Sequence, residues 1–284
     1  MLNFTKMHGL GNCYIYVNCF EENVPNPNEL AKICANVHFG LGADGLVLIM
    51  PSKTADFKMR IFNADGTEAE VSGNATRCVG KYVFEKGLTS QTSITIETLG
   101  GIKKIDLAIE NGVVNEVTVD MGKFVIVPSK IPIALEGDSV IHKPISVDGK
   151  EYRITGVSMG NPHAVVYVRN VEELDIEEIG PKFESHELFP QRINTEFVQV
   201  IDRNVLKMRV WERGNGETWE CGTGACATVV ASVLNGLCDY DSEVTVILRA
   251  GELKVICKKD GTVILKGPAA FIYDGSLYDN VIPE

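Results

Sequence analysis

Hydrophobic and polar residues alternate along much of the chain, a pattern that predicts β-strands with one buried face. We expect two strands joined by a glycine loop within residues 3–18, and strands at 46–50, 57–62, 93–98, 102–108 and 113–120. Further strands are expected at 125–135, 145–154 and within 156–168. Helical periodicity is confined to shorter stretches at 27–36, at 74–86 and, in pieces, at 172–187.

A different pattern follows Cys221, where the run from Ala225 to Leu234 is apolar almost all round. A helix of this kind is expected to be central and buried rather than on the surface. Asn235 and Gly236 provide a stop signal. The sequence therefore predicts a buried helix that begins just after Cys221.

The chain repeats itself at a constant shift. Lys58–Asn63 matches Lys207–Glu212 at 149 residues, which is 207 minus 58, and the same shift places Ser72 on Cys221. The alternative is a chance similarity between strand-like and glycine-rich segments. A self-comparison plot of the sequence would distinguish a duplication from chance. We predict an α+β fold of two pseudo-symmetric β-barrel-like domains, each wrapped around a central helix. The expected domains are 1–121 plus 268–284, and 122–267.

Composition narrows the class of protein. The 284 residues carry a net charge of −11 without a run of basic residues, which argues against nucleic-acid binding. No apolar stretch approaches the ~20 residues needed to cross a membrane. The eight cysteines form no Cys-x-x-Cys pair, so we expect reduced thiols in a cytoplasmic protein, without disulfides or a metal site. No nucleotide loop and no pyridoxal-phosphate lysine motif are visible, so no cofactor is expected.

Cys221 is the first candidate for chemistry. A thiol at a helix start feels the positive end of the helix dipole, which is expected to lower its pKa from about 8.5. The free N–H groups of the same first turn can hold a carboxylate. The alternative is a buried structural cysteine, since free cysteines are among the most buried residues.

The duplication gives this site a partner. If the two halves pack face to face, the helix starts at Gly73–Asn74 and Gly222–Thr223 hold one carboxylate, and residues 72 and 221 flank the adjoining carbon. Inverting a stereocentre needs this arrangement, with a base on one face and an acid on the other. The pattern indicates cofactor-independent racemisation of an amino acid.

Several motifs extend over nearly the whole chain in one order. They are His8-Gly-Leu-Gly-Asn12, Gly40-Leu-Gly-Ala-Asp44, Asn63-Ala-Asp-Gly-Thr-Glu, Gly160-Asn-Pro-His163, Glu212-Arg-Gly-Asn-Gly-Glu and Cys221-Gly-Thr-Gly-Ala. In these motifs the chain resembles the diaminopimelate epimerase family. The resemblance implies conversion of LL- to meso-diaminopimelate in lysine and cell-wall precursor synthesis. It also implies a homodimer to which the last strand, around Tyr273, contributes.

The same resemblance assigns roles to single residues. Cys221 resembles one of two proton-transfer cysteines, Glu212 the acceptor of the substrate ammonium group, and Arg213 the partner of the distal carboxylate. His163 supports the site. The backbone at Gly73, Asn74, Gly222 and Thr223 resembles the carboxylate cradle, and the polar contacts are Asn12, Asn63, Asn161 and Asn194. For each asparagine, turn formation is the alternative, and for Arg213 it is a solvated loop charge.

Ser72 departs from the family, which has its other catalytic cysteine at this position. A hydroxyl is far less acidic than a thiol and is expected to be a poor base. An engineered Cys→Ser exchange, a natural relative with an altered base and a one-base lyase all remain open. Racemisation of another amino acid such as histidine, and a non-catalytic amino-acid-binding protein, are the rival functions.

Overall fold

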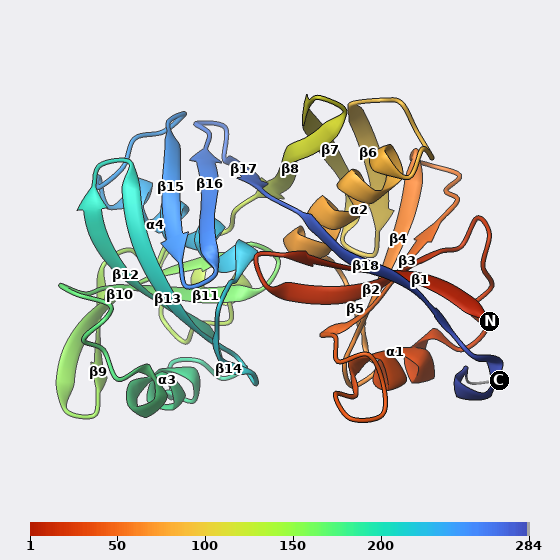
Figure 1. The fold of residues 1–284 in the computed structure, drawn as a ribbon. Coiled ribbons are helices and arrows are strands. Elements are labelled where there is room, and N and C mark those ends of the chain that lie inside the picture. Colours follow the sequence, from red (N-terminus) through yellow and green to blue (C-terminus); the bar gives the residue numbers. More distant parts are fainter. Residues whose placement is uncertain (283–284) are drawn as a thin grey trace. The chain divides into compact units, whose positions relative to one another are not determined.

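The computed structural model describes residues 1–282 and divides into two compact units. The first unit comprises Met1–Val119 together with the chain from Gly267 onward, and the second comprises Asp120–Lys266. The C-terminal segment enters the first unit through a strand that pairs antiparallel with the first strand of the chain, with Leu2 opposite Leu277. The first unit is therefore built from both ends of the sequence (Figure 1).

In the first unit, most of the elements are strands. They are β1 (Leu2–Gly9), β2 (Asn12–Asn18), β3 (Gly45–Met50), β4 (Phe57–Asn63), β5 (Glu68–Ala69), β6 (Ser93–Thr98), β7 (Gly101–Glu110), β8 (Val113–Lys123) and β18 (Ala270–Leu277), with helices α1 (Pro27–Ala35) and α2 (Gly73–Glu85) and the 3₁₀ turn η2 (Asp279–Val281). Helix α2 is buried along most of its length and contacts β1, β4 and β7. Helix α1 packs on β3 and β4 over a separate apolar cluster.

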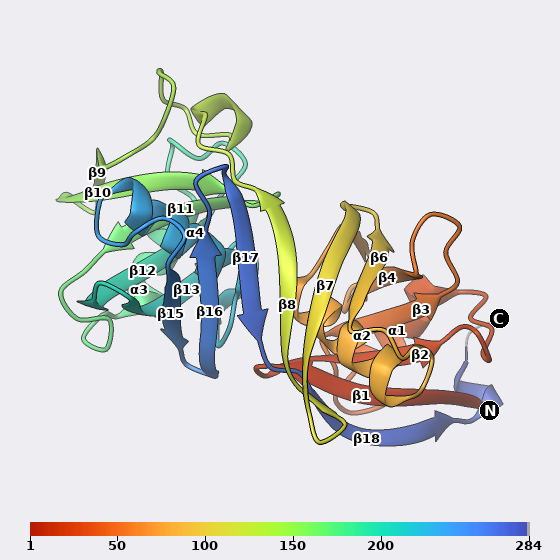
Figure 2. The ribbon, with the colours of Figure 1, turned by 90° about the horizontal axis from the view of Figure 1, so that it is seen from above.

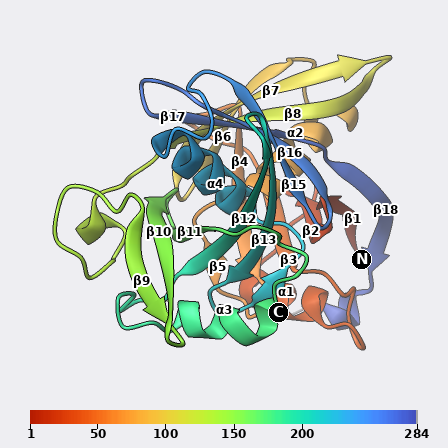
Figure 3. The same cartoon turned by 90° about the vertical axis from the view of Figure 1, so that its left-hand side faces the viewer.

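The second unit has the same plan. Its strands are β9 (Lys143–Val147), β10 (Lys150–Ser158), β11 (Pro162–Tyr167), β12 (Asn194–Asp202), β13 (Val205–Glu212), β14 (Gly216–Thr218), β15 (Glu243–Leu248), β16 (Gly251–Cys257) and β17 (Thr262–Gly267), and its helices are α3 (Ile176–Glu184), α4 (Gly222–Leu234) and the 3₁₀ turn η1 (Pro128–Lys130). Helix α4 contacts β10, β11, β12, β13, β15 and β16, so strands surround it (Figures 2 and 3). The predicted central helix is confirmed: apart from Thr223, every residue from Gly222 to Val233 is buried.

The duplication extends to the pairing register. Leu46 lies opposite Phe62 in the β3–β4 pair, and 149 residues later Thr195 lies opposite Trp211 in the β12–β13 pair. The parallel pairs β2–β3 and β11–β12 repeat at the same shift. The pair β4–β6 recurs as β13–β15 with a shift of 149 residues on the first strand and 150 on the second, since Phe57 lies opposite Ile96 and Leu206 opposite Val246. Because a slip of one residue would turn every side chain to the other face, the shared register shows that both units use one pattern. The predicted α+β fold of two pseudo-symmetric units is confirmed.

A bidentate ion pair also recurs in both units. Arg60 on β4 binds Glu68, and Arg209 on β13 binds Glu217. The second pair is the more deeply buried, with side chains 15% and 6% exposed against 34% and 23% in the first. Arg209 also donates to the carbonyl oxygens of Val171 and Leu174, at 3.0 and 2.8 Å, and so fixes the loop that leads to α3.

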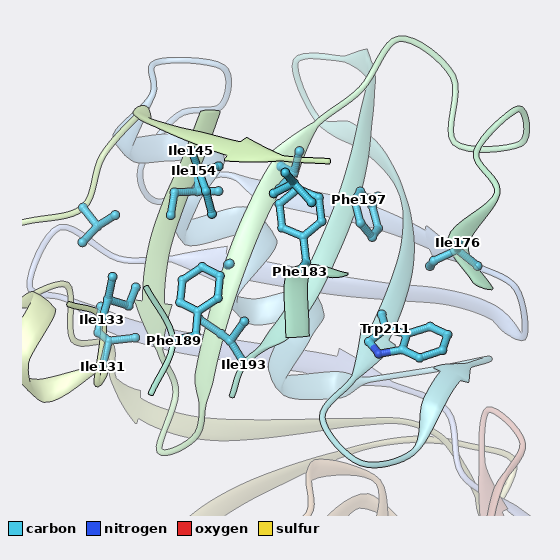
Figure 4. Packing of buried hydrophobic residues seen from close by; sticks show 14 residues of the cluster. Ile131, Ile133, Ile145, Ile154, Ile176, Phe183, Phe189, Ile193, Phe197 and Trp211 are labelled. Atoms are coloured by element: carbon cyan, nitrogen blue, oxygen red, sulfur yellow. The ribbon is translucent and has the colours of Figure 1, made fainter. Parts of the chain in front are cut away.

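A second core in the C-terminal unit lies between α3 and the strands, as the close-up in Figure 4 shows. Phe183 of α3 packs edge-on against Phe197 of β12, with ring centroids 5.4 Å apart. Gly180 lies against the Trp211 ring, where an added Cβ would come within 2.3 Å of the indole. This helix can therefore approach the sheet only because position 180 has no side chain.

One predicted strand is wrong. The segment 125–135 contains a single isolated bridge, between Val125 and Ser158, followed by η1. Pro128 and Pro132 lack the N–H that a strand ladder requires. The stretch predicted as one strand at 145–154 forms parts of two, β9 and β10, joined by a tight turn.

Candidate active site

In the first unit, Ser72 is the N-cap of α2. Its backbone is extended (φ −138°, ψ 124°), and its Oγ accepts a hydrogen bond from the Ala75 N–H at 3.3 Å. Gly73 and Asn74 form the first turn, whose leading N–H groups precede any intrahelical bond. The position predicted for the first base is therefore at a helix start, occupied by a capping hydroxyl.

Two predicted asparagines flank this turn differently. The Asn74 amide donates to Asn12 Oδ1 at 3.1 Å, and Asn12 donates to Asp44 at 2.9 Å. Asn63, at the end of β4, donates to the Thr67 hydroxyl at 3.1 Å and shapes the turn that follows. The structure brings Asn12 to the helix start, whereas the side-chain bond of Asn63 lies within its own turn.

In the second unit, Cys221 is the N-cap of α4, with nearly the same backbone as Ser72 (φ −139°, ψ 104°). Its sulfur accepts from the Gly224 N–H at 3.4 Å and lies 3.5 Å from the Thr223 hydroxyl. Gly222 and Thr223 form the first turn of the helix. Cys221 is 6% exposed, so it is almost wholly removed from water.

The predicted lowering of the Cys221 pKa is wrong. Burial raises the pKa of this thiol well above its ordinary value, and the nearby carboxylates of Glu212 and Glu196 raise it further. The Thr223 hydroxyl acts in the opposite direction but is outweighed. Burial and the three acidic side chains, the third being Glu220, raise the thiol pKa by more than the helix start lowers it. Cys221 therefore rests as a neutral thiol.

Glu212 stands at the end of β13, next to Cys221. Burial raises the pKa of the Glu212 carboxyl, while the hydrogen bond from the Thr218 hydroxyl lowers it in part. A carboxylate that is removed from water is stabilised when a cation pairs with it. The position suits an ammonium group.

His163 is fully buried and forms a pair that the sequence did not reveal. Its Nδ1 lies 2.6 Å from Glu196 Oε1, and neither side chain is exposed. Its Nε2 lies 2.9 Å from Asn161 Oδ1, and the Asn161 amide donates to Thr223 at 3.2 Å. The only sequence signal for Glu196 is an acid among apolar strand residues, which is costly unless the acid is paired.

Asn194 and Arg213 lie close together, at the start of β12 and just after β13. Asn194 is buried, donates to the Pro162 carbonyl at 3.0 Å and accepts from the Arg213 backbone N–H at 2.9 Å. The Arg213 guanidinium is exposed and donates to the Gln191 carbonyl at 2.9 Å. Asn194 thus shapes the backbone that carries Arg213.

Neither a metal site nor a membrane-spanning helix is found in the described part of the chain. Within residues 1–282, no group of three or more His, Cys, Asp or Glu side chains is arranged to hold a metal ion. In the same range no helix is both long and apolar enough to span a bilayer.

The fold defines the class first. A probable proline racemase from Agrobacterium radiobacter K84 superposes with a TM-score of 0.73, covering 98% of this chain and 93% of that one at 14% identity. At this level of identity the likeness concerns the fold alone. The chain therefore has the architecture of the proline racemase-like proteins.

The sequence comparisons define the family. The diaminopimelate epimerase family model matches residues 4–127 and 155–272. A diaminopimelate epimerase of Acetivibrio thermocellus is 56% identical over 277 residues, which is 97% of this chain and 98% of that protein. One from Methanococcus maripaludis is 52% identical, covering 97% of this chain and 99% of its own length. The chain belongs to the diaminopimelate epimerase family, as the sequence motifs predicted.

Proposed function

We propose that this protein converts LL-diaminopimelate to meso-diaminopimelate by two-base proton transfer without a cofactor, in lysine and peptidoglycan precursor synthesis. Its relatives at about half identity over nearly the full chain carry the name of that enzyme. The observation that carries the proposal is the capping of α4 by Cys221 beside Glu212, repeated in α2 by Ser72 at the equivalent position.

Each unit supplies half of the proposed site, and we take the halves as 1–121 plus 268–284, and 122–267. The first turns of α2 and α4 would receive the carboxylate at the reacting carbon, since helix starts bind anions. Glu212 would accept the substrate ammonium group and Arg213 the distal carboxylate. The remaining polar contacts are those of Asn12, Asn63, Asn161 and Asn194, with His163 behind them.

The electrostatics of Cys221 supports a role for the substrate in its own activation. Burial and the Glu212 carboxylate hold the thiol protonated. An ammonium group placed against Glu212 would offset that negative charge and make the thiolate less costly. In one direction Cys221 then returns a proton to the α-carbon, and in the other it removes one, while residue 72 does the reverse from the opposite face.

Ser72 limits the reaction. A serine hydroxyl is a poor general base, and general acid–base catalysis contributes about 10²–10⁴-fold. We therefore propose that the chain as it stands epimerises slowly. The same substitution leaves a one-base lyase on this fold as the second candidate, because Cys221 alone retains a thiol.

The test is α-proton exchange of LL-diaminopimelate in deuterated water, with and without Ser72→Cys. Cys221 already shows that a cysteine fits this backbone at a helix start. Ser72→Cys is expected to raise inversion by about 10²–10⁴-fold, and Cys221→Ala in the same background is expected to abolish it. Equal turnover by the parent protein and the Ser72→Cys variant would contradict the two-base assignment.

A panel of other substrates separates the rivals. Faster exchange of histidine or another amino acid than of LL-diaminopimelate would redirect the substrate assignment. Release of ammonia or water would favour the lyase. Tight binding without exchange, even after Ser72→Cys, would favour a binding protein.

We also propose a cytoplasmic homodimer. Ile272 and Tyr273 on β18 are apolar and 47% and 43% exposed, which suits a surface covered by a second copy. Size-exclusion chromatography with light scattering of Tyr273→Glu tests this, because a buried charge there would shift the protein to monomer.

A further inference from the structure

Arg77 is fully buried in helix α2 of the first unit, one turn after the helix begins. Its Nε donates to the Pro268 carbonyl at 3.2 Å, but neither of its terminal nitrogens has a hydrogen-bond partner within residues 1–282. An arginine keeps its positive charge in a protein and carries five N–H donors. A buried charge is costly unless an opposite charge pairs with it. The described part of the chain does not supply that charge to Arg77.

Lys81, one turn further along α2, provides an internal comparison. Arg77 and Lys81 are the only buried cationic side chains in the described part of the chain. The Lys81 ammonium group donates to Glu85 Oε1 at 2.7 Å and to the Val114 carbonyl at 2.8 Å, so its charge is compensated. The uncompensated charge is therefore a property of position 77 and not of the helix as a whole.

The Arg77 guanidinium lies against the first turn of α2. Helical side chains lean toward the N-terminus of their helix. A Cβ added to Gly9 at the end of β1 would lie 3.0 Å from Arg77 Nη2 and 3.2 Å from Asn74 Cβ, so both groups border one point. Asn74 belongs to the first turn, and a helix start binds anions. The charge of Arg77 is thus added to the positive end of the helix dipole.

Asp44 is the acidic residue that contacts this region, and its carboxylate binds other groups. Its Oδ2 accepts from the Asn12 amide at 2.9 Å and from the Cys13 N–H at 2.6 Å. The Asp44 residue is exposed, so water also solvates its charge. Asp44 therefore holds the glycine loop in place and leaves the charge of Arg77 uncompensated.

The second unit has the opposite charge at the start of its central helix. The position 149 residues after Arg77 carries Cys226, which has no positive charge. The thiol at the start of α4 is instead surrounded by the carboxyl groups of Glu212, Glu196 and Glu220. The start of α2 therefore suits an anion, whereas the start of α4 suits a cation.

We propose that Arg77 is the counter-ion of the substrate carboxylate, which binds at the start of α2. The inference rests on the proposed function and deepens it, because it assigns the carboxylate to the first unit and the ammonium group to Glu212 of the second. Removal of the α-proton builds further negative charge on the carboxylate. A fixed cation in a buried position stabilises that charge more strongly in the transition state than in the bound substrate.

The first measurement is differential scanning calorimetry of the whole protein without ligand. Arg77→Met removes a buried charge that no described residue compensates, and it is expected to raise the melting temperature by about 2–4 °C. Lys81→Met is the matched control on the same helix, and it is expected to lower the melting temperature because it leaves Glu85 without its cation. An Arg77→Met protein that melts below the parent, or that does not fold, would overturn the proposal.

The second measurement repeats the scans in a concentration series of sodium formate, the smallest carboxylate. Formate is expected to raise the melting temperature of the parent, of Lys81→Met and of Arg77→Lys, which keeps the positive charge. The shift is expected to be much smaller in Arg77→Met, while general salt effects are shared by all four proteins. Equal shifts in the parent and Arg77→Met, or a loss of the shift in Arg77→Lys as well, would overturn the proposal.

The third measurement is α-proton exchange of LL-diaminopimelate in the Ser72→Cys background. Arg77→Met is expected to lower kcat about 10–100-fold, and Arg77→Lys is expected to retain most of it. No exchange by the Ser72→Cys protein, together with the expected formate shifts, would contradict the proposed function and still support an anion site at Arg77. Full exchange by Arg77→Met in that background would overturn the role of Arg77 and leave the epimerase assignment intact.

Discussion

Outside the proposed site, removal of the Glu184 side chain is expected to cause the largest loss in the free energy of unfolding. Its carboxylate accepts from the Trp211 indole at 2.7 Å, the Gly214 N–H at 3.0 Å and the Arg192 guanidinium at 3.0 Å. Burial alone would raise the Glu184 pKa, but these bonds outweigh burial and the pKa is lowered. Glu184→Ala leaves the indole and the Gly214 N–H unsatisfied. At about 1–3 kcal/mol for each buried donor, the expected loss is about 3–5 kcal/mol.

The assay is urea unfolding followed by tryptophan fluorescence. Both tryptophans, Trp211 and Trp219, lie in the second unit, so the signal reports that unit. Glu184→Gln keeps an acceptor and is expected to cost about 1–2 kcal/mol. Glu178→Ala on the same helix is the control, because Glu178 is 68% exposed and its pair with Lys182 is worth about 0.5 kcal/mol or less. A loss below about 1 kcal/mol for Glu184→Ala, or an equal loss for Glu178→Ala, would refute the reasoning.

Three further predictions concern stability. Gly180→Ala, which in an ordinary helix gains up to about 1 kcal/mol, is expected to lose about 1–3 kcal/mol here by overpacking against Trp211, measured by thermal melting. Arg209→Met is expected to lower the free energy of unfolding by about 1–3 kcal/mol, because it removes a largely buried ion pair and two bonds to backbone carbonyls while Arg249 still binds Glu217. The equivalent Arg60→Met is expected to cost about 1 kcal/mol, and urea titrations of the two proteins compare them. The third prediction concerns stability at low pH. Hydrogen bonds from neighbouring hydroxyl and ammonium groups lower the Glu97 pKa from 4.5 to about 2. Its stabilising contribution is therefore complete above pH 4.5 and lost as the pH falls to about 2, which a pH series of melting temperatures checks.

The central helix and the duplication could be predicted because short stretches of the sequence are enough to identify both. The apolar run after Cys221 has no polar face, so only a buried helix accommodates it. The constant shift between the halves then carried over to the pairing register of β3–β4 and β12–β13. The prediction of a strand at 125–135 was wrong because it gave hydrophobicity more weight than Pro128 and Pro132.

The electrostatics of the site could not be predicted in the same way. The effect of a helix start on Cys221 is local, but Glu196 and Glu212 reach the thiol from β12 and β13, and only the tertiary structure brings them there. The pairing of Glu196 with His163 spans 33 residues and leaves no motif. Whether positions 72 and 221 serve one carbon, and where the domains divide, stay predictions.

The pairing of β18 with β1 has a consequence for synthesis on the ribosome. Residues 270–277 leave the exit tunnel after every strand of the second unit, yet they complete the sheet of the first. The contiguous second unit has all its strands earlier, so it is expected to become protease-resistant on nascent chains while the N-terminal unit is still missing its edge. The usual order, in which N-terminal domains fold first, is then inverted. A chaperone that covers the unpaired edge of β1 until β18 is made would increase the yield of folded protein.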